Sequence, residues 1–223
     1  MSTRSLFATL AAENAASHAQ TLHHPAVLGI GDGSLPEATF RYYIEQDYNF
    51  LRRYVRVLAQ AVATSPDLPT ATKLAELVSS TLSVEVGALV ALYAAFGGVR
   101  DDLDAVKPAP TCQAYTDHLL SRAAGGNLFV IFASVLPCQW GYREIGHHLH
   151  ERGLPDDARY ARWIEEYSSD EYGAFVDWLI ARFDVLAATE SDVSHEAARE
   201  AFTLSTHYER AFWEMAWTLQ QWH

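Results

Sequence analysis

The chain has 223 residues, of which 49% are hydrophobic and 20% are charged, and its net charge is -12. This composition is that of an ordinary globular protein with a large core, and the length favours one domain. The acidic balance and the lack of a basic cluster exclude nucleic acid as an expected partner. The first 20 residues lack the apolar centre of a secretory signal, and no later segment is interpreted as a membrane span. We therefore expect a cytoplasmic protein without a membrane partner, in which Cys112 and Cys138 stay reduced.

Helical periodicity extends along the whole chain, and no stretch shows the alternation or hairpin signals of strands. A capping box at Ser34 to Glu37, with Pro36 in the first turn, predicts one strong helix start, and the glycines at 29, 31 and 33 before it predict a loop. The predicted helices span residues 3–22, 35–64, 70–96, 111–123, 127–152, 155–167, 169–182 and 192–223. The sequence therefore predicts an all-α fold, a single-domain helical bundle of about eight helices covering residues 1–223.

The predicted helix over residues 127–152 is unusual. It starts apolar and ends polar, with Asn127 as the expected N-cap and Gly153 as the expected stop. Pro137 lies inside it, where proline removes a backbone hydrogen bond at a cost of about 3 kcal/mol. We therefore expect a kink at Cys138 and a compensating reason for the proline.

Cys138 and Tyr142 are four residues apart and share a face of that helix. A thiol beside freed backbone groups, with a phenol one turn away, suits a nucleophile. A buried free cysteine is also commonly an inert small hydrophobe. The local pattern alone leaves both interpretations open.

Two acids lie on helix faces that are otherwise apolar. Asp47 lies within the core-facing stripe of the helix over residues 35–64, and Glu209 lies among aromatic residues of the last helix. A buried carboxylate is costly unless it is paired or functional. A carboxyl group in an aromatic pocket suits a general acid near neutral pH, although a structural ion pair explains each acid equally well. A helical bundle can bring such groups and Cys138 together around a flat, ring-shaped ligand.

A metal site is not expected. Glu144 and His147 form one Glu-x-x-His unit, whereas di-iron bundles use two such units, and the second is missing. The histidines at this helix end fit a solvated terminus. His23 or His24 as an axial haem ligand, in a metal-dependent helical oxidase, is the alternative.

Four motifs follow one another along nearly the whole chain: Phe40-x-x-Tyr43-x-x-Gln46-Asp47-x-x-Phe50-Leu51, Leu136-Pro137-Cys138-x-Trp140-x-Tyr142-x-x-Ile145-Gly146, Trp163-Ile164-x-x-Tyr167 and Glu209-x-x-Phe212-Trp213-x-Met215-Ala216. Together they resemble the TenA or thiaminase II family, in its cysteine-containing branch. The segments around Cys138 and Glu209 are the most specific.

This resemblance implies a haem-oxygenase-like fold without haem or another cofactor, and a homotetramer. It implies hydrolysis of 4-amino-5-aminomethyl-2-methylpyrimidine to the hydroxymethyl pyrimidine and ammonia in thiamin salvage, with thiamin cleavage as a secondary activity. Hydrolysis of a related formylated aminopyrimidine, or a binding module without turnover, remains an alternative.

The resemblance also implies roles for individual residues. Cys138 corresponds to the nucleophile, Glu209 to the acid and base, and Asp47 to the carboxylate that binds the amidine-like ring edge. The corresponding pocket residues are Tyr115, which supports the cysteine, Tyr142 and Tyr167, with Tyr172 as an alternative to Tyr167. Phe50 departs from the family, which often has tyrosine there, so substrate preference is the property most affected.

Overall fold

The computed structural model describes residues 5–222, and all regular elements within them are helices. It forms twelve α-helices and one π-helical turn. The elements are α1 (Leu6–Glu13), α2 (Ala15–Leu22), α3 (Pro25–Asp32), α4 (Glu37–Ala63), α5 (Leu68–Ser80), η1 (Thr81–Glu85), α6 (Val86–Ala95), α7 (Arg100–Ala105), α8 (Pro110–Ala124), α9 (Leu128–Glu151), α10 (Ala158–Tyr167), α11 (Asp170–Ala187) and α12 (Asp192–Thr218). The all-α prediction is confirmed.

Residues 25–32 form helix α3, so the predicted loop there is wrong. Pro25 occupies the first turn, where its missing N–H costs nothing, and the His24 side chain accepts a hydrogen bond from the Ala26 N–H. Gly29 lies inside this helix, and glycine is favoured there because a Cβ would come within 3.1 Å of the Leu35 backbone nitrogen. Gly33 ends the helix with a φ of 75°. The glycines therefore serve close packing and one cap.

The predicted helix starts are confirmed in part. Asn127 caps α9, because its Oδ1 accepts a hydrogen bond from the Phe129 N–H at 2.8 Å. Ser169 caps α11 through the Tyr172 N–H. The prediction of a capping box at Ser34 is wrong, since α4 follows Pro36 without a side-chain cap. Residues 100–105 form α7 where a loop was expected.

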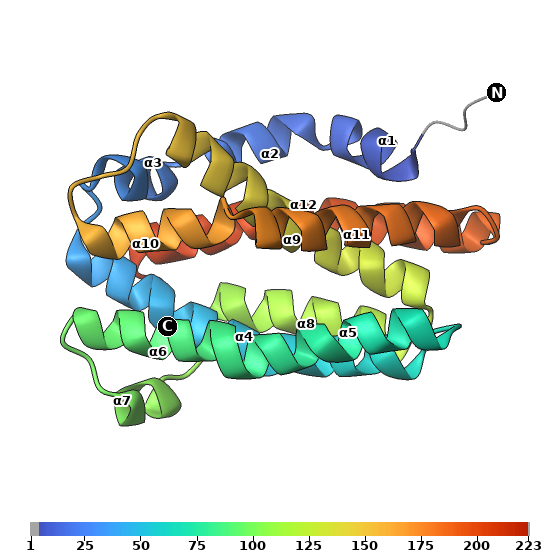
Figure 1. Cartoon of the computed structure of the whole chain (residues 1–223), viewed down its shortest axis with the longest axis horizontal. Coiled ribbons are helices and arrows are strands. Elements are labelled where there is room, and N and C mark those ends of the chain that lie inside the picture. The colour runs from blue at the N-terminus through green and yellow to red at the C-terminus, as the bar shows by residue number, and fades with distance from the viewer. Residues whose placement is uncertain (1–4, 223) are drawn as a thin grey trace. The chain divides into compact units, whose positions relative to one another are not determined.

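The contacts between residues divide the chain into two compact units. Among the described residues, the first unit comprises residues 5–35 and 132–214, and the second comprises residues 36–131 and 215–222. In the second unit α4 packs against α5, α6 and α8, as the ribbon shows (Figure 1). The expectation of a single domain over residues 1–223 stays a prediction.

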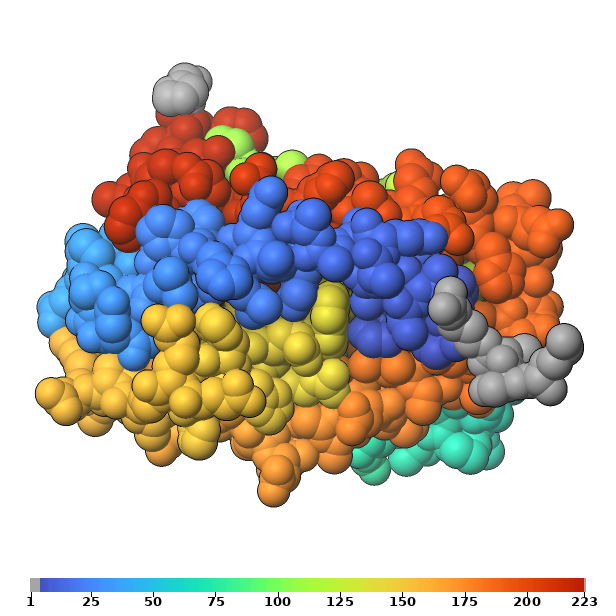
Figure 2. Space-filling model, turned by 90° about the horizontal axis from the view of Figure 1, so that it is seen from above, coloured from blue at the N-terminus to red at the C-terminus, as the bar shows by residue number. Residues whose placement is uncertain are grey.

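In the first unit α1 packs against α11, and α3 packs against α10. Helices α1 to α3, in blue, run beside the end of α9 and α10 on one face of this unit (Figure 2). The Tyr160 hydroxyl of α10 donates a hydrogen bond of 2.7 Å to the buried Leu35 carbonyl. This bond fixes α10 next to the chain that follows α3.

The segment α5–η1–α6 is long and apolar. It covers Leu68–Ala95, 28 residues, with a mean hydropathy of 1.6 in its most apolar window, of which only 22% is buried. By length and composition alone it satisfies the requirement for a membrane span, as the core helices of many globular proteins also do. Leu82 and Val84 are each 55% exposed on it.

Candidate active site

The first unit contains a cluster of large aromatic side chains from three helices. The aromatic cluster consists of Tyr142 on α9, Trp163 and Tyr167 on α10, and Trp213 on α12. The Tyr142 and Tyr167 ring centroids lie 4.8 Å apart, and those of Trp163 and Tyr167 lie 4.7 Å apart. Trp163 and Trp213 meet edge to face at 5.9 Å. Tilted and edge-to-face rings of this kind suit the binding of another flat ring.

The close approach of α9 and α10 depends on Gly146. A Cβ at this position would lie 2.5 Å from the Tyr167 carbonyl carbon and 2.7 Å from the Ser168 nitrogen. These are backbone atoms, which cannot rotate out of the way. The glycine therefore allows the end of α10 to rest directly on α9, one turn beyond Tyr142.

Cys138 and Glu209 are positioned next to this aromatic cluster by helix geometry. Cys138 precedes Tyr142 by four residues on α9, and Glu209 precedes Trp213 by four residues on α12. Residues at that spacing lie one above the other on one helix face. Cys138 is 8% exposed and Glu209 is 6% exposed. Thiol and carboxyl group therefore each lie one helical turn from a member of the aromatic cluster, and both are shielded from bulk water.

Tyr167, rather than Tyr172, belongs to the aromatic cluster. The Tyr167 ring lies 4.8 Å from Tyr142, whereas the Tyr172 ring meets Tyr167 edge to face at 5.3 Å. The Tyr172 hydroxyl instead lies 3.0 Å from Gln139 Oε1 and 3.2 Å from the Gln139 carbonyl oxygen. Tyr172 thus contacts the residue that directly follows Cys138.

The other predicted residues lie in the second unit. Asp47 and Phe50 are on α4 and Tyr115 is on α8, and all three are buried. The Phe50 ring lies 5.2 Å from Tyr115 and is stacked on Tyr54 at 5.6 Å. The structure therefore brings Phe50 and Tyr115 together, as it brings Tyr142 and Tyr167 together in the first unit.

The register of α4 against α8 explains this pairing. The Cys112 thiol donates to the Gln46 carbonyl at 3.4 Å, Phe50 contacts Tyr115, and Arg53 pairs with Asp117. Residue numbers rise along both helices from one contact to the next, so α4 and α8 run in the same direction. Gln46 also fixes the connection before α8, because its Oε1 accepts a hydrogen bond of 2.7 Å from the Ala109 N–H.

The two cysteines differ in their surroundings. Cys112 is fully buried, and burial together with the nearby Asp47 carboxylate raises the pKa of its thiol to about 12. A thiol with that pKa stays protonated at neutral pH and is a poor nucleophile. Cys138 is therefore the better candidate of the two.

The two histidines considered as haem ligands from the sequence make different contacts. His24 uses both ring nitrogens, one to cap α3 and the other at 3.0 Å from Glu214 Oε2. His23 Nδ1 bonds to the Ala19 carbonyl at 2.8 Å. Glu144 pairs with Arg143. In the described part of the chain, no three His, Cys, Asp or Glu side chains gather closely enough to hold a metal ion.

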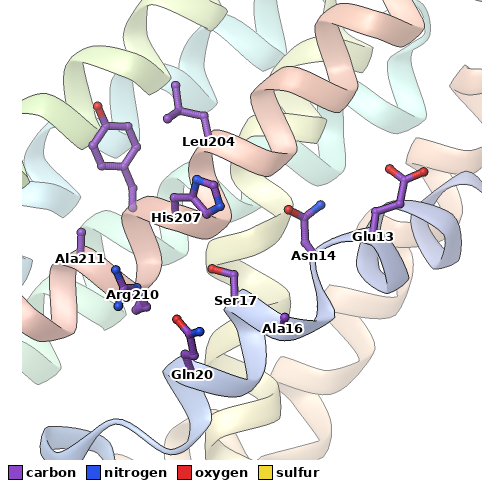
Figure 3. A pocket seen from close by; sticks show the side chains of 10 residues that line it. Glu13, Asn14, Ala16, Ser17, Gln20, Leu204, His207, Arg210 and Ala211 are labelled. Atoms are coloured by element: carbon purple, nitrogen blue, oxygen red, sulfur yellow. The ribbon is translucent and has the colours of Figure 1, made fainter.

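An open groove of about 660 Å³ lies elsewhere on the first unit, between α2 and α12 (Figure 3). It is lined by Glu13, Asn14, Ala16, Ser17, Gln20, Leu204, His207, Tyr208, Arg210 and Ala211. None of the predicted catalytic or substrate-binding residues lines this groove. The groove adjoins the predicted site along the chain, since Tyr208 and Arg210 are the neighbours of Glu209.

Sequence reasoning included Trp163 and Trp213 in the motifs but gave them no role in the site. The signal that identifies Trp213 is its spacing of four residues from Glu209. Trp163 lies four residues before Tyr167, on the same face of α10. Helical spacing from a predicted site residue would therefore have found both tryptophans of the aromatic cluster.

The fold and the buried residues define a class of protein. The chain has a haem-oxygenase-like fold: it superimposes with a TM-score of 0.74 on a structure from Shewanella denitrificans described as a domain of unknown function with that fold, covering 96% of this chain and 92% of that one at 13% identity. Residues 12–219 match the TENA/THI-4/PQQC family. The chain belongs to this family.

Several relatives are similar over nearly their whole length. An aminopyrimidine aminohydrolase from Halalkalibacterium halodurans is 37% identical over 204 residues, covering 90% of each chain. One from Bacillus subtilis is 34% identical, covering 89% of this chain and 84% of the relative. A TenA homologue from P. horikoshii has a TM-score of 0.89 at 28% identity, covering 96% of this chain and 99% of that one.

Proposed function

We propose that the protein is an aminopyrimidine aminohydrolase that converts 4-amino-5-aminomethyl-2-methylpyrimidine and water to the 5-hydroxymethyl pyrimidine and ammonia. The observation that supports this most is the placement of Cys138 and Glu209, each one helical turn from a ring of the same aromatic cluster. A nucleophile and an acid beside stacked rings are what substitution next to an aromatic heterocycle requires. The names of the relatives from two bacilli support the same reaction.

The reaction proceeds in two halves. The Cys138 thiolate adds to a ring carbon, which breaks the aromaticity and leaves a ring nitrogen protonated. The amine then leaves the neighbouring methylene with a proton from Glu209, and an exocyclic double bond remains. Water adds to that methylene carbon while the Glu209 carboxylate takes its proton. Loss of the ring N–H proton and expulsion of the thiolate restore the aromatic product. Two moderate barriers replace one high barrier.

The other predicted residues orient the ring. Asp47 accepts hydrogen bonds from the amidine-like edge, which holds the 4-amino group and fixes the protonation of a ring nitrogen. Phe50 offers a ring face, and Tyr115, its neighbour at 5.2 Å, supports the cysteine. Tyr142 and Tyr167 supply further pocket surface. No cofactor takes part in this scheme.

Phe50 favours a second candidate substrate. Where the resemblance implies a tyrosine, this chain lacks the hydroxyl, so one hydrogen bond to the substrate is missing. A polar substrate loses affinity when a partner for its donor or acceptor is absent. A related formylated aminopyrimidine, hydrolysed by the same thiol chemistry, is therefore the substrate to compare, together with thiamin.

We also propose that the protein works in the cytoplasm as a homotetramer. The exposed side of α5–η1–α6 supports self-association, because residues 77–99 contain only one charged side chain, Glu85, in a chain of net charge -12. Glu85 itself accepts a hydrogen bond from Thr81. Copies that meet through this face, which carries few charges, keep their acidic surfaces apart.

The decisive experiment measures ammonia release from 4-amino-5-aminomethyl-2-methylpyrimidine. Cys138→Ser is expected to lower kcat by roughly a thousand-fold or more, because hydroxyl is not a nucleophile at neutral pH without further activation. Cys112→Ser is the matched control and should keep turnover within about two-fold, since Cys112 is a protonated, buried thiol. Full turnover by the Cys138 variant would disprove the mechanism. No turnover by wild type would disprove the proposed substrate.

A further inference from the structure

Tyr172 forms a contact with α9 directly beside the proposed nucleophile. Its hydroxyl lies 3.0 Å from Gln139 Oε1 and 3.2 Å from the Gln139 backbone carbonyl oxygen. A tyrosine hydroxyl has one proton, so it donates to one of the two oxygens at a time or is shared between them. Gln139 is only 8% exposed, so water competes little for these positions.

The same part of α9 has lost a backbone hydrogen bond. Pro137 lies inside the helix and has no N–H, so the Ala133 carbonyl lacks its usual helical donor. Cys138 follows directly, and the turn that carries it is therefore held by fewer backbone bonds than its neighbours. The Tyr172 hydroxyl adds a bond from another helix at the next residue.

Tyr172 is itself held on two sides. Its backbone N–H donates to the Ser169 cap at 3.2 Å, which fixes it in the first turn of α11. Its ring meets Tyr167 edge to face at 5.3 Å, with an interplanar angle of 85°. One residue thus contacts both the turn of Cys138 and a member of the aromatic cluster. A shift of either relative to the other would break one of these contacts.

We propose that Tyr172 and Gln139 are positioning residues that hold the Cys138 turn of α9 in register with the ring of Tyr167. This inference rests on the proposed function for its kinetic consequence but not for the contact itself. Tyr172 does not touch the reacting atoms in this role. It acts by limiting how far the thiol can move from the ring that the aromatic cluster binds.

The test compares Tyr172→Phe with Tyr160→Phe. Both variants remove one hydroxyl that donates to a backbone carbonyl of the first unit and keep the aromatic ring. Tyr172→Phe is expected to lower kcat for the aminopyrimidine about five-fold, the effect of one lost hydrogen bond, with KM unchanged. Tyr160→Phe should change kcat less than two-fold. Gln139→Leu should lower kcat by less than Tyr172→Phe does, and should add nothing to it in the double variant.

Amide hydrogen exchange gives a readout that needs no substrate. In Tyr172→Phe the amides of residues 139–143 should exchange several-fold faster, with Tm within about one degree of that of Tyr160→Phe. Equal exchange in both variants would overturn the inference. An altered KM with unchanged kcat would overturn it too, because Tyr172 would then be a substrate contact. If wild type turns over no aminopyrimidine, the proposed function fails, while exchange still decides whether Tyr172 holds the turn.

Discussion

The Tyr142 ring lies 4.8 Å from the Tyr167 ring, and the residue that permits this contact is Gly146, one turn further along α9. Replacing Gly146 by alanine should destabilise the protein by about 1–3 kcal/mol, because its Cβ would meet backbone atoms of Tyr167 and Ser168. Urea denaturation measures the change. Gly141→Ala on the same helix is the control: its Cβ meets nothing within 4 Å, so it should be neutral or stabilise by up to about 1 kcal/mol. Equal effects of the two substitutions would contradict the close approach.

The Cys112 thiol should resist alkylation by iodoacetamide in the folded protein. Native protein at pH 8 should leave Cys112 unmodified, since the pKa of its thiol is raised to about 12 and its side chain is fully buried. Peptide mass spectrometry of the labelled protein locates the alkylated residue. Cys112 should react once urea unfolds the chain, which shows that the fold protects it. Alkylation of Cys112 in the native state, at the rate of a free thiol, would refute this assignment.

Acid should destabilise the protein through His18. This ring is stacked on Trp140 at 4.0 Å, and burial lowers the pKa of His18 below its ordinary value near 6.5, although Glu144 opposes the shift. The unfolded chain then binds a proton that the folded chain does not, so stability is complete above about pH 6.5 and falls as pH decreases from there to the lowered pKa.

Urea unfolding between pH 5 and 7.5 measures how the free energy of unfolding changes with pH. One such group contributes a slope of up to about 1.4 kcal/mol per pH unit. His18→Phe keeps a ring against Trp140 and should flatten the curve. His207→Phe, at an exposed histidine of α12, should leave it unchanged. His148 adds to the slope in wild type, because burial and the charge of Arg152 lower its pKa as well. An unaltered slope in His18→Phe would assign the effect to other groups.

Phe50→Tyr tests the departure from the family. The new hydroxyl should lower KM for the aminopyrimidine about five-fold, the value of one hydrogen bond, with kcat little changed. Stopped assays with the aminomethyl and the formylated pyrimidines provide both constants. A gain for the aminomethyl compound alone shows that Phe50 sets the preference between them. Unchanged constants for both would mean that the ring face, and not its polar end, meets the substrate.

Assembly should depend on Leu82, which is 55% exposed on the α5–η1–α6 segment. A charge at a buried subunit contact costs several kcal/mol, so Leu82→Asp should reduce the molecular mass found by sedimentation. Leu68→Asp, at an 82% exposed residue in the first turn of α5, is the control. A tetramer that survives Leu82→Asp would place the contact elsewhere.

Periodicity predicted most of the fold correctly because amphipathic spacing is local. It failed at residues 25–32, where Gly29 and Gly31 suggested a loop. Gly29 packs against the Leu35 backbone, and a Cβ at Gly31 would lie 2.7 Å from Leu149 Cδ2. The contact of Gly31 joins residues more than a hundred positions apart, so the local sequence pattern does not reveal it.

The candidate site also has features that a local pattern predicts and features that depend on contacts between helices. Asp47 and Glu209 were recognised because a carboxylate in an apolar stripe is costly, and this cost is visible in one helix. The contact of Tyr172 with Gln139 was not, because it joins α11 to α9. The choice between Tyr167 and Tyr172 likewise needed the position of α10 on α9, which Gly146 determines. The catalytic roles of these residues stay predictions.

His24 joins two helices through the two nitrogens of one ring. The Ala26 N–H can only donate, so Nδ1 of His24 must accept, and the proton lies on Nε2, which donates to Glu214. Asparagine or aspartate would cap α3 as well but is too short to reach α12, and glutamine or lysine would reach it without capping. Each of these other side chains therefore gives up either the cap of α3 or the contact with α12.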